Sequence, residues 1–277
     1  MAFGFHTSLT GSLTETIQSH LDNGCRGIQT CIVGTKLSTS DLTSTRSLLQ
    51  ESGFRLYTHT CVSLNPAAPA PAVFRSIVSL REELRPVNAV GASCVLHIGT
   101  QTTGKTQDGT LANVLTTLKS LPLTERSSGQ RYPLLLENAA GEGRKLGSTL
   151  SDLEFLGRGI QEANLAVGFC LDTAHAFGAG LFDFSSSELI DDMFDMVDEA
   201  IGVGRLQLIH LNDSKIKFGG KADRHENIGY GHIWQGDKEP CVYLLRECKK
   251  RGIDVMLEPP TERIAMDYQW GCKARNS

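Results

Sequence analysis

The sequence lacks the features of a membrane-bound or secreted protein. Among its 277 residues, no stretch approaches the ~20 consecutive apolar residues that a transmembrane helix needs. Residues 1–6 contain no basic segment followed by an apolar one, so the N-terminus does not resemble a secretory signal. We therefore expect an intracellular protein without membrane association, in the cytoplasm or the nucleus.

Cysteine motifs are also missing, although the chain has eight cysteines. None of them forms a C-x-x-C pair, which argues against a zinc ribbon or a dithiol redox site, and a chain of this size does not need a disulfide scaffold. Cys94 and Cys170 lie within apolar runs, where packing in the core is the expected role of a thiol. The sequence therefore predicts free thiols.

The chain is poor in aromatic residues (6%) and has no excess of basic residues, since its formal net charge is −4. A protein that binds nucleic acid is usually basic, so the charge by itself argues against such a partner. The content of 40% hydrophobic and 21% charged residues is typical of a globular protein and gives no support for a disordered or fibrous one.

Eight short β-rich runs alternate with amphipathic segments, a pattern that indicates repeated βα units around a parallel sheet. The runs span 3–7, 27–33, 55–60, 93–99, 132–139, 166–173, 205–213 and 254–260. Segments with helical spacing of apolar residues span 73–85, 110–121, 149–163, 186–201 and 240–251. We therefore predict an α/β fold, a (β/α)8 TIM barrel, in a single domain that spans residues 1–277.

Capping signals and loop composition mark the boundaries of these units. Serine-rich segments at 38–42 and 185–189 are typical of helix starts, and Gly53, Gly202 and Gly252 are placed where helices end. The loops 65–71 and 100–109 follow the third and fourth runs. The active face of such a barrel is built at the C-terminal ends of the strands, so these loops are candidates for contact with a substrate.

Six consecutive runs each end in a residue that can bind a metal ion. These residues are His59, His97, Glu137, Asp172, His210 and Glu258. Any one of them alone would be interpreted as a hydrogen-bonded loop residue. A barrel brings all strand ends onto one ring, and carboxylates and imidazoles gathered there without a metal would suffer desolvation and repulsion. The pattern therefore predicts a metal centre.

A second group of ligands extends this centre. His175 follows Asp172 by three residues, and Asp223 and His225 lie in the loop after the seventh run. The segment 223–225 alone would indicate a polar surface loop. Together with the six strand-end residues, it predicts a neighbouring site with nitrogen and oxygen ligands.

Four segments, at 136–143, 168–180, 210–215 and 223–229, resemble the signatures of the endonuclease IV family, and the similarity extends from His6 to Glu258. The resemblance implies a zinc-dependent apurinic/apyrimidinic endonuclease with up to three zinc ions. It also implies that the substrate is double-stranded DNA with abasic sites, cut on the 5′ side to leave a 3′-hydroxyl and a 5′-deoxyribose phosphate. We expect a monomer.

By this resemblance, the nine ligand positions of the family all have counterparts here. They fall into a first pair, His59 and His97; a bridging residue, Glu137; a second set, Asp172, His210 and Glu258; and a third set, His175, Asp223 and His225. Glu137 would also be catalytic, orienting the attacking water. Three Zn²⁺ ions would turn the net charge of −4 into +2, concentrated at one mouth of the barrel.

The residues expected to contact DNA are His6, Lys36 and Arg224. The sequence departs from the family at two loops that usually hold DNA. The loop after the second run carries no basic residue other than Lys36, and no tyrosine follows His59 closely. Loop residues in 62–72 or 100–108 are therefore expected to take part.

Two other functions remain open. A sugar isomerase or epimerase of the same barrel architecture would need only one metal ion, held by Glu137, Asp172, His210 and Glu258, and would leave five ligands without a role. A non-catalytic protein that binds zinc or nucleic acid would be expected if a ligand position had been lost, and none has been. The metal stoichiometry separates the single-metal enzyme from the nuclease.

Overall fold

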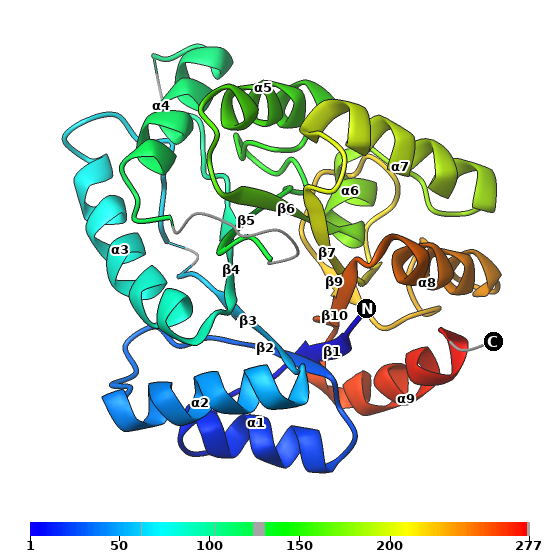
Figure 1. Ribbon diagram of the computed structural model, residues 1–277. Helices are drawn as coiled ribbons and strands as arrows, with labels where there is room; N and C mark the ends of the chain where they lie inside the picture. The colour runs from blue at the N-terminus through cyan, green and yellow to red at the C-terminus, as the bar shows by residue number, and fades with distance from the viewer. Residues whose placement is uncertain (62, 103, 124–130, 276–277) are drawn as a thin grey trace.

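The computed structural model describes residues 1–61, 63–102, 104–123 and 131–275. In this part of the chain, eight parallel strands form a closed barrel, and helices surround it (Figure 1). The order around the barrel is β1-β10-β7-β6-β5-β4-β3-β2. Each barrel strand therefore pairs with the barrel strand that comes next along the chain, and the last one, β10, pairs with β1. The predicted (β/α)8 fold is confirmed.

Each predicted run contains one barrel strand. The strands are β1 Phe3–His6, β2 Gly27–Thr30, β3 Arg55–His59, β4 Ser93–His97, β5 Leu134–Glu137, β6 Val167–Asp172, β7 Leu206–His210 and β10 Asp254–Leu257. The strands are shorter than the predicted runs because the pairing ends where the chain turns into the loops at either end of the barrel.

The helices lie between the strands and include the five that the apolar spacing predicted. Their bounds are α1 Leu13–Asp22, α2 Thr39–Ser52, α3 Val73–Val90, α4 Gln107–Lys119, α5 Leu150–Glu162, α6 Thr173–Ala179, α7 Ser187–Ile201, α8 Glu239–Arg251 and α9 Ile264–Ala274, with a 3-10 turn at Thr261–Arg263. No helix in the described ranges is both long and apolar enough to cross a membrane.

The predicted helix boundaries have the expected caps. The side chains of Ser38 and Ser186 accept backbone hydrogen bonds at the starts of α2 and α7. Gly53 and Gly252 end α2 and α8 with φ values of 66° and 69°, a conformation that glycine adopts without a steric penalty, and Gly202 ends α7.

The largest difference between a predicted and an observed helix boundary lies at the end of α3. The helix expected over 73–85 continues through Pro86 and spans Val73–Val90. Proline removes one backbone hydrogen bond and costs about 3 kcal/mol inside a helix. The last turn nevertheless forms because Val87 and Val90 are buried against the barrel. Tertiary packing thus outweighs the local preference.

A short antiparallel pair was not expected from the sequence. It joins β8 (Asp213–Ser214) to β9 (His225–Glu226) and lies beyond the C-terminal end of β7. The pair fixes both ends of the loop 215–224 beside the mouth of the barrel. It therefore places His225 next to the strand ends.

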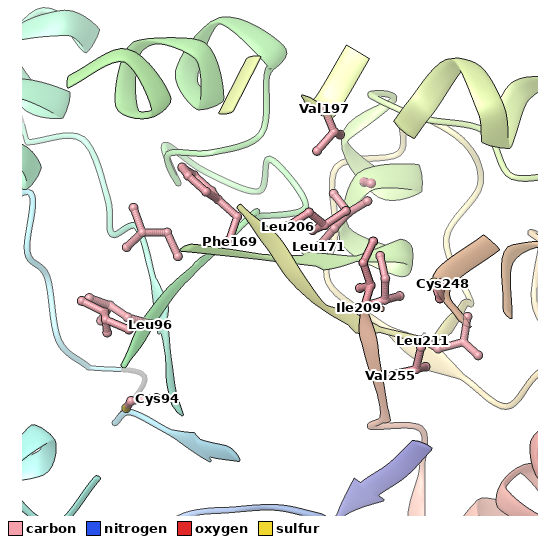
Figure 2. Packing of buried hydrophobic residues seen from close by; sticks show 14 of the residues in the cluster. Cys94, Leu96, Phe169, Leu171, Val197, Leu206, Ile209, Leu211, Cys248 and Val255 are labelled. Carbon is pink, nitrogen blue, oxygen red and sulfur yellow. The ribbon is translucent and has the colours of Figure 1, made fainter. Parts of the chain in front are cut away.

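The core has two apolar layers, one outside and one inside the barrel. Figure 2 shows the outer layer, where Leu171, Ile209 and Val255 lie on the strand faces toward the helices that carry Val197 and Cys248. The inner layer fills the barrel with side chains from successive strands. Its members are Ala2, Tyr57, Val95, Tyr132, Leu135, Cys170, Leu208 and Met256. Both thiols assigned to the core, Cys94 and Cys170, are free and buried, as predicted.

Two glycines make room for the inner layer. A Cβ atom at Gly4 would lie 2.0 Å from the carbonyl oxygen of Gly27 and 2.9 Å from the sulfur of Met256, and one at Gly27 would lie 2.7 Å from the Met256 methyl group. Only glycine fits at these positions of β1 and β2. The long Met256 side chain from β10 fills the space that the two glycines leave.

A buried carboxylate closes the barrel at the N-terminal ends of its strands, which we call the lower end. Asp254 is 1% exposed and accepts hydrogen bonds from the Ala2 amide (2.6 Å) and the Tyr57 hydroxyl (2.7 Å). Arg131 Nη2 lies 3.1 Å from Asp254 Oδ2, and Arg55 Nε lies 3.7 Å away. These contacts compensate the charge of Asp254 and tie β1, β3 and β10 together at this end.

The close packing of α5 on α7 gives a test of the fold. A Cβ atom at Gly157 would lie 2.3 Å from the Ala200 carbonyl oxygen and 2.6 Å from Ile201 Cα, both backbone atoms. We expect Gly157→Ala to lower the free energy of unfolding by about 1–3 kcal/mol. At Gly159 the close atoms belong to the flexible end of the Leu115 side chain, so Gly159→Ala should be neutral or slightly stabilising.

Urea denaturation of the two variants provides the measurement, and each serves as the control for the other. Equal stabilities of the two variants would contradict the described contact between α5 and α7.

Candidate metal centre

The alternation of side chains along the strands places a ring of polar residues above the inner apolar layer. Side chains two residues apart point to the same side of a strand. In six strands the polar residue lies two positions after a member of the inner layer, and in β1 and β2 it lies two positions after Gly4 and Gly27. The polar residues are His6, Gln29, His59, His97, Glu137, Asp172, His210 and Glu258. They meet at the C-terminal mouth, where enzymes of this architecture have their active sites.

Glu137 lies at the centre of this ring and is 1% exposed. Its Oε2 atom is 3.1 Å from His59 Nε2 and 3.4 Å from His97 Nδ1. Its Oε1 atom is 2.9 Å from His210 Nδ1 and 3.5 Å from His175 Nδ1. One carboxylate thus faces imidazoles from both sides, as a group that bridges two metal sites would.

Two groups of potential ligands share Glu137. In each group, the possible ligand atoms all lie within 4.8 Å of one another. The first group consists of His59, His97 and Glu137; the second consists of Glu137, Asp172, His210 and Glu258. His210 Nδ1 is 3.0 Å from Glu258 Oε2, so β7 and β10 contribute directly to the second group.

A third group lies on the side of α6 and β9. Asp223 is 3.2 Å from His175 Nε2 through Oδ2 and 3.4 Å from His225 Nε2 through Oδ1. The two imidazole Nε2 atoms are 3.4 Å apart, and His225 Nε2 is 3.5 Å from Asp172 Oδ2. Asp172 therefore lies between the second and third groups. All nine residues singled out in the sequence come together at this mouth.

Hydrogen bonds fix the orientation of the imidazoles. Three rings donate their Nδ1–H to a backbone carbonyl oxygen at 2.9–3.2 Å: His59 to Thr60, His175 to Asn138 and His225 to Glu258. A neutral imidazole that donates from one nitrogen has a lone pair on the other. The Nε2 atoms of these rings therefore face the cluster, and each offers a lone pair to a metal ion when its ring is neutral.

His210 has the reverse orientation. Its Nε2 lies 2.8 Å from Oε1 of Gln29, which is completely buried, so Nδ1 is the nitrogen that faces the cluster. The amide of Gln29 also donates to Glu258 Oε1. Gln29 thereby orients two of the predicted ligands at once, although the sequence analysis did not single it out.

Two asparagines were missed as well. Asn138 Oδ1 accepts a hydrogen bond from the Asp172 amide at 2.6 Å, and Asn212 Nδ2 donates to Asp172 Oδ2 at 2.7 Å. The amide of Glu258 donates to Asn212 Oδ1 at 2.9 Å. Their positions in the sequence, directly after Glu137 and two residues after His210, were the available signal.

The charges show that the cluster favours added positive charge. Burial alone would raise the pKa of Glu137, yet attraction to His97 and His210 holds it well below its usual range. Burial opposes protonation of His175, but the carboxylates of Asp172 and Asp223 raise its pKa to about 10. The hydrogen bond from His175 lowers the pKa of Asp223 to about 2.

One buried nitrogen among the predicted ligands forms no hydrogen bond. His97 Nδ1 forms no hydrogen bond with any described residue, although it is buried. A buried nitrogen without a partner costs free energy unless another group satisfies it, and a metal ion would do so. The donor set of imidazole nitrogens and carboxylate oxygens also matches the preferences of zinc. The residues present therefore fit a metal centre.

The three residues expected to contact DNA lie around this mouth. His6 Nδ1 is 3.5 Å from Glu258 Oε1 and 3.3 Å from Gln29 Nε2, which places His6 at the edge of the cluster itself. Lys36 is exposed in the loop after β2. Arg224 is exposed and donates to the carbonyl oxygen of Asp223 at 2.6 Å.

The two long loops named as candidates lie side by side. Asn65 Nδ2 donates to the carbonyl oxygen of Thr100 at 3.2 Å and so connects them. Residues 62 and 103, which belong to the segments expected to hold DNA, lie outside the described residues.

Comparison with known proteins gives a family and a set of relatives. The family model described as "Xylose isomerase-like TIM barrel" matches residues 19–275. Proteins named "Probable endonuclease 4" from Methanoculleus marisnigri and Symbiobacterium thermophilum are 31% and 32% identical over 273 residues, which cover 95% of this chain and 94% of each relative.

Solved structures share the fold. Endonuclease IV from Thermus thermophilus superimposes with a TM-score of 0.80 at 24% identity and covers 100% of this chain and 98% of its own. A D-tagatose 3-epimerase-like protein superimposes with a TM-score of 0.72 at 21% identity, covering 100% and 97%. At these identities the structures show the fold alone, and the functions of the two neighbours differ.

The convergence of nitrogen and oxygen ligands predicts that divalent metal stabilises the protein. A ligand at 100 times its dissociation constant adds about 2.7 kcal/mol to the free energy of unfolding. For a chain of this length, this corresponds to a rise of roughly 5–10 °C in the melting temperature. We expect exhaustive chelation to lower the melting temperature by at least this amount and added Zn²⁺ to restore it.

Differential scanning calorimetry before and after chelation provides the measurement. Added Mg²⁺, which prefers oxygen ligands and octahedral geometry, is the control and should restore little. A melting temperature independent of chelation and of added Zn²⁺ would contradict a metal centre.

Proposed function

The chain belongs to the endonuclease IV family within the xylose isomerase-like TIM barrels, and from this premise we propose that it is a zinc-dependent hydrolase of DNA. In this proposal it cuts the phosphodiester 5′ to an abasic site in base excision repair, leaving a 3′-hydroxyl and a 5′-deoxyribose phosphate. The observation that carries the proposal is the convergence of all nine predicted ligands into three adjoining groups.

In this proposal, three sets of residues hold the zinc ions. His59, His97 and Glu137 would hold one zinc ion, and Asp172, His210 and Glu258 would hold a second with Glu137 shared between them. His175, Asp223 and His225 would hold the third. When bound, such ions supply an activated water molecule and neutralise charge on the phosphate and on the leaving oxygen.

The protein's own residues perform three tasks in this proposal. Glu137 orients the attacking water and can accept its proton, because its carboxylate lies at the centre of the cluster and is held ionised. The carbonyl oxygens and Gln29 hold the imidazoles in the orientation that ligation requires. Arg224, which is exposed beside Asp223, would contact a phosphate of the DNA backbone.

A single-metal isomerase or epimerase is the second candidate. The observation in its favour is that a D-tagatose 3-epimerase-like protein has the same fold. Such an enzyme would use the second group alone, formed by Glu137, Asp172, His210 and Glu258. It would give no role to the third group, whose Asp223 and two imidazoles lie within 3.4 Å. A non-catalytic zinc or nucleic-acid carrier is disfavoured because no ligand is missing.

Incubation with a duplex that carries one abasic analogue tests the proposed activity. We expect hydrolytic incision on the 5′ side and complete loss of incision after chelation. Glu137→Gln keeps the side-chain volume but removes the charge and basicity, so its rate should fall by orders of magnitude while the barrel stays folded. Denaturing gels report the products, and circular dichroism reports the fold.

An isosteric change away from the cluster, Gln18→Glu on the exposed face of α1, provides a folded control that should cut at the normal rate. Full activity in a metal-free preparation, a β-elimination product, or near-normal turnover by Glu137→Gln would refute the proposal.

Removal of the third group separates the nuclease from the isomerase. Asp223→Ala and His225→Ala should each release one zinc ion of three, while the other two groups keep theirs. Incision should fall by more than the roughly 10–100-fold typical of a change outside the ligand shell. Mass spectrometry under native conditions measures the zinc content on the same samples as the gel assay. Unchanged zinc and unchanged incision in both variants would favour the single-metal enzyme.

A further inference from the structure

The second and third groups of ligands are connected by more than their proximity. The second group lies on the barrel strands β5, β6, β7 and β10, and the third lies on α6 and on the segment that leads into β9. Two continuous paths of hydrogen bonds run from one group to the other. Each path passes through a residue that contributes to both groups, either with its side chain or with its backbone.

The first path runs from Asp172 to His175. Asp172 ends β6 and caps α6, because its Oδ1 atom accepts a hydrogen bond from the His175 amide at 2.7 Å. The side chain of Asn138 bonds to both the amide and the carbonyl oxygen of Asp172, at 2.6 Å and 3.1 Å. The carbonyl oxygen of Asn138 accepts from His175 Nδ1 at 3.1 Å. Asp172 and His175 are therefore held as one unit, although they belong to different groups.

The second path runs from Glu258 to His225. The Glu258 side chain belongs to the second group, where its Oε2 atom lies 3.0 Å from His210 Nδ1. Its carbonyl oxygen accepts a hydrogen bond from His225 Nδ1 at 3.2 Å and so orients a ligand of the third group. A shift of the backbone at Glu258 would therefore displace ligands of both groups.

Asn212 joins the two paths. Its side chain is completely buried, donates from Nδ2 to Asp172 Oδ2 at 2.7 Å and accepts at Oδ1 from the Glu258 amide at 2.9 Å. The Thr173 hydroxyl fixes the backbone of Asn212, because it lies 2.7 Å from the carbonyl oxygen and 2.9 Å from the amide nitrogen. A displacement of Asp172 therefore strains the segment that carries Glu258.

The first group is connected in a different way. His59 donates to the carbonyl oxygen of Thr60, its own neighbour in the chain. His97 Nδ1 has no hydrogen bond with any residue that the structure describes. The ligand that this group shares with the second group is the side chain of Glu137. The backbone connections described above thus link the second group to the third.

The chemistry of the two asparagines suits a positioning role. A lysine or arginine in contact with Asp172 would compensate the charge of this carboxylate and weaken its attraction for a metal ion. An amide is neutral and offers both a donor and an acceptor, so it can hold a ligand on each side and leave the charge in place. Asn138 and Asn212 are both buried, and each uses its donor and its acceptor in this way.

We propose that Asn138 and Asn212 are positioning residues that couple the second and third groups, so that a zinc ion in one group raises the affinity of the other. This inference rests on the part of the proposed function that assigns a zinc ion to each group. The first ion immobilises Asp172 and Glu258, and the ligands connected to them are then already in place for the next ion. Such coupling is reciprocal and typically changes an affinity by about 5–150-fold.

Native mass spectrometry of the His97→Ala variant measures the coupling. This variant removes a ligand of the first group, so two zinc ions should bind at saturation. Free zinc is then set with a chelator so that the average is one ion per protein. Two independent sites would leave at least about half of the molecules with one ion, whatever their affinities. We expect fewer than about a third, the fraction for two similar sites coupled by a factor of ~5.

The asparagine variants test whether these side chains carry the coupling. In the His97→Ala background, Asn212→Leu and Asn138→Leu should raise the fraction with one ion to about half or more, while two ions still bind at saturation. Leucine matches the branching of asparagine but forms no hydrogen bonds. The matched control is Gln207→Met, which removes another buried amide on β7, one that accepts from the Tyr132 amide at 2.9 Å outside the ligand groups. This control should keep the low fraction.

The melting temperature of the metal-free proteins shows whether each variant is folded. If leucine at a buried position prevents folding, Asn212→Asp replaces it. Aspartate keeps the acceptor for the Glu258 amide but loses the donor to Asp172, so the fraction with one ion should again rise. A control that raises this fraction as much as the asparagine variants do would show that the coupling does not depend on Asn138 and Asn212, and would overturn the proposal.

The failure of this inference differs from the failure of the proposed function. If His97→Ala binds two ions but at least about half of the molecules hold one ion at the midpoint, the two groups are independent. The inference is then wrong, and the proposed function stands. If His97→Ala binds no more than one ion at saturation, the assignment of a zinc ion to each group is wrong and both proposals fail.

Discussion

The buried carboxylate of Glu137 is the constraint on which the mouth of the barrel depends. An ionised carboxylate removed from water costs several kcal/mol unless positive charge or hydrogen bonds compensate it. Here four imidazole nitrogens from different elements lie within 3.5 Å of it. Three of these rings are oriented by further contacts, from carbonyl oxygens or from Gln29. The polar network at the mouth is therefore organised around the compensation of one charge.

The regular alternation of the strands explains why the site could be predicted from the sequence. Side chains two positions apart on a strand point to the same side. Because Tyr57 and Leu208 point into the barrel, His59 and His210 point inward as well, one level closer to the mouth. The strand ends were recognisable because apolar runs stop there. The helix caps at Ser38 and Gly53 were recognisable for a similar local reason, since they depend on one side chain or one φ angle.

The features that were not predicted depend on contacts between distant segments. Gln29 carries no titratable group, so only its position beside His210 and Glu258 reveals what it does. The two-residue strands β8 and β9 are too short to leave a pattern and form because they pair with each other. The extension of α3 past Pro86 likewise reflects burial against the barrel, which a local preference cannot anticipate.

The closed lower end of the barrel limits how molecules can reach the centre. Asp254 and its partners, together with the inner layer that includes Tyr57 and Met256, fill the barrel interior below the polar ring. Whatever enters the mouth must leave by the same route. A long polymer cannot thread through the barrel; it has to lie across the mouth and bend one internal segment down into it. The architecture therefore suits the cleavage of an internal bond of a polymer, whose two product ends leave through the mouth of the barrel.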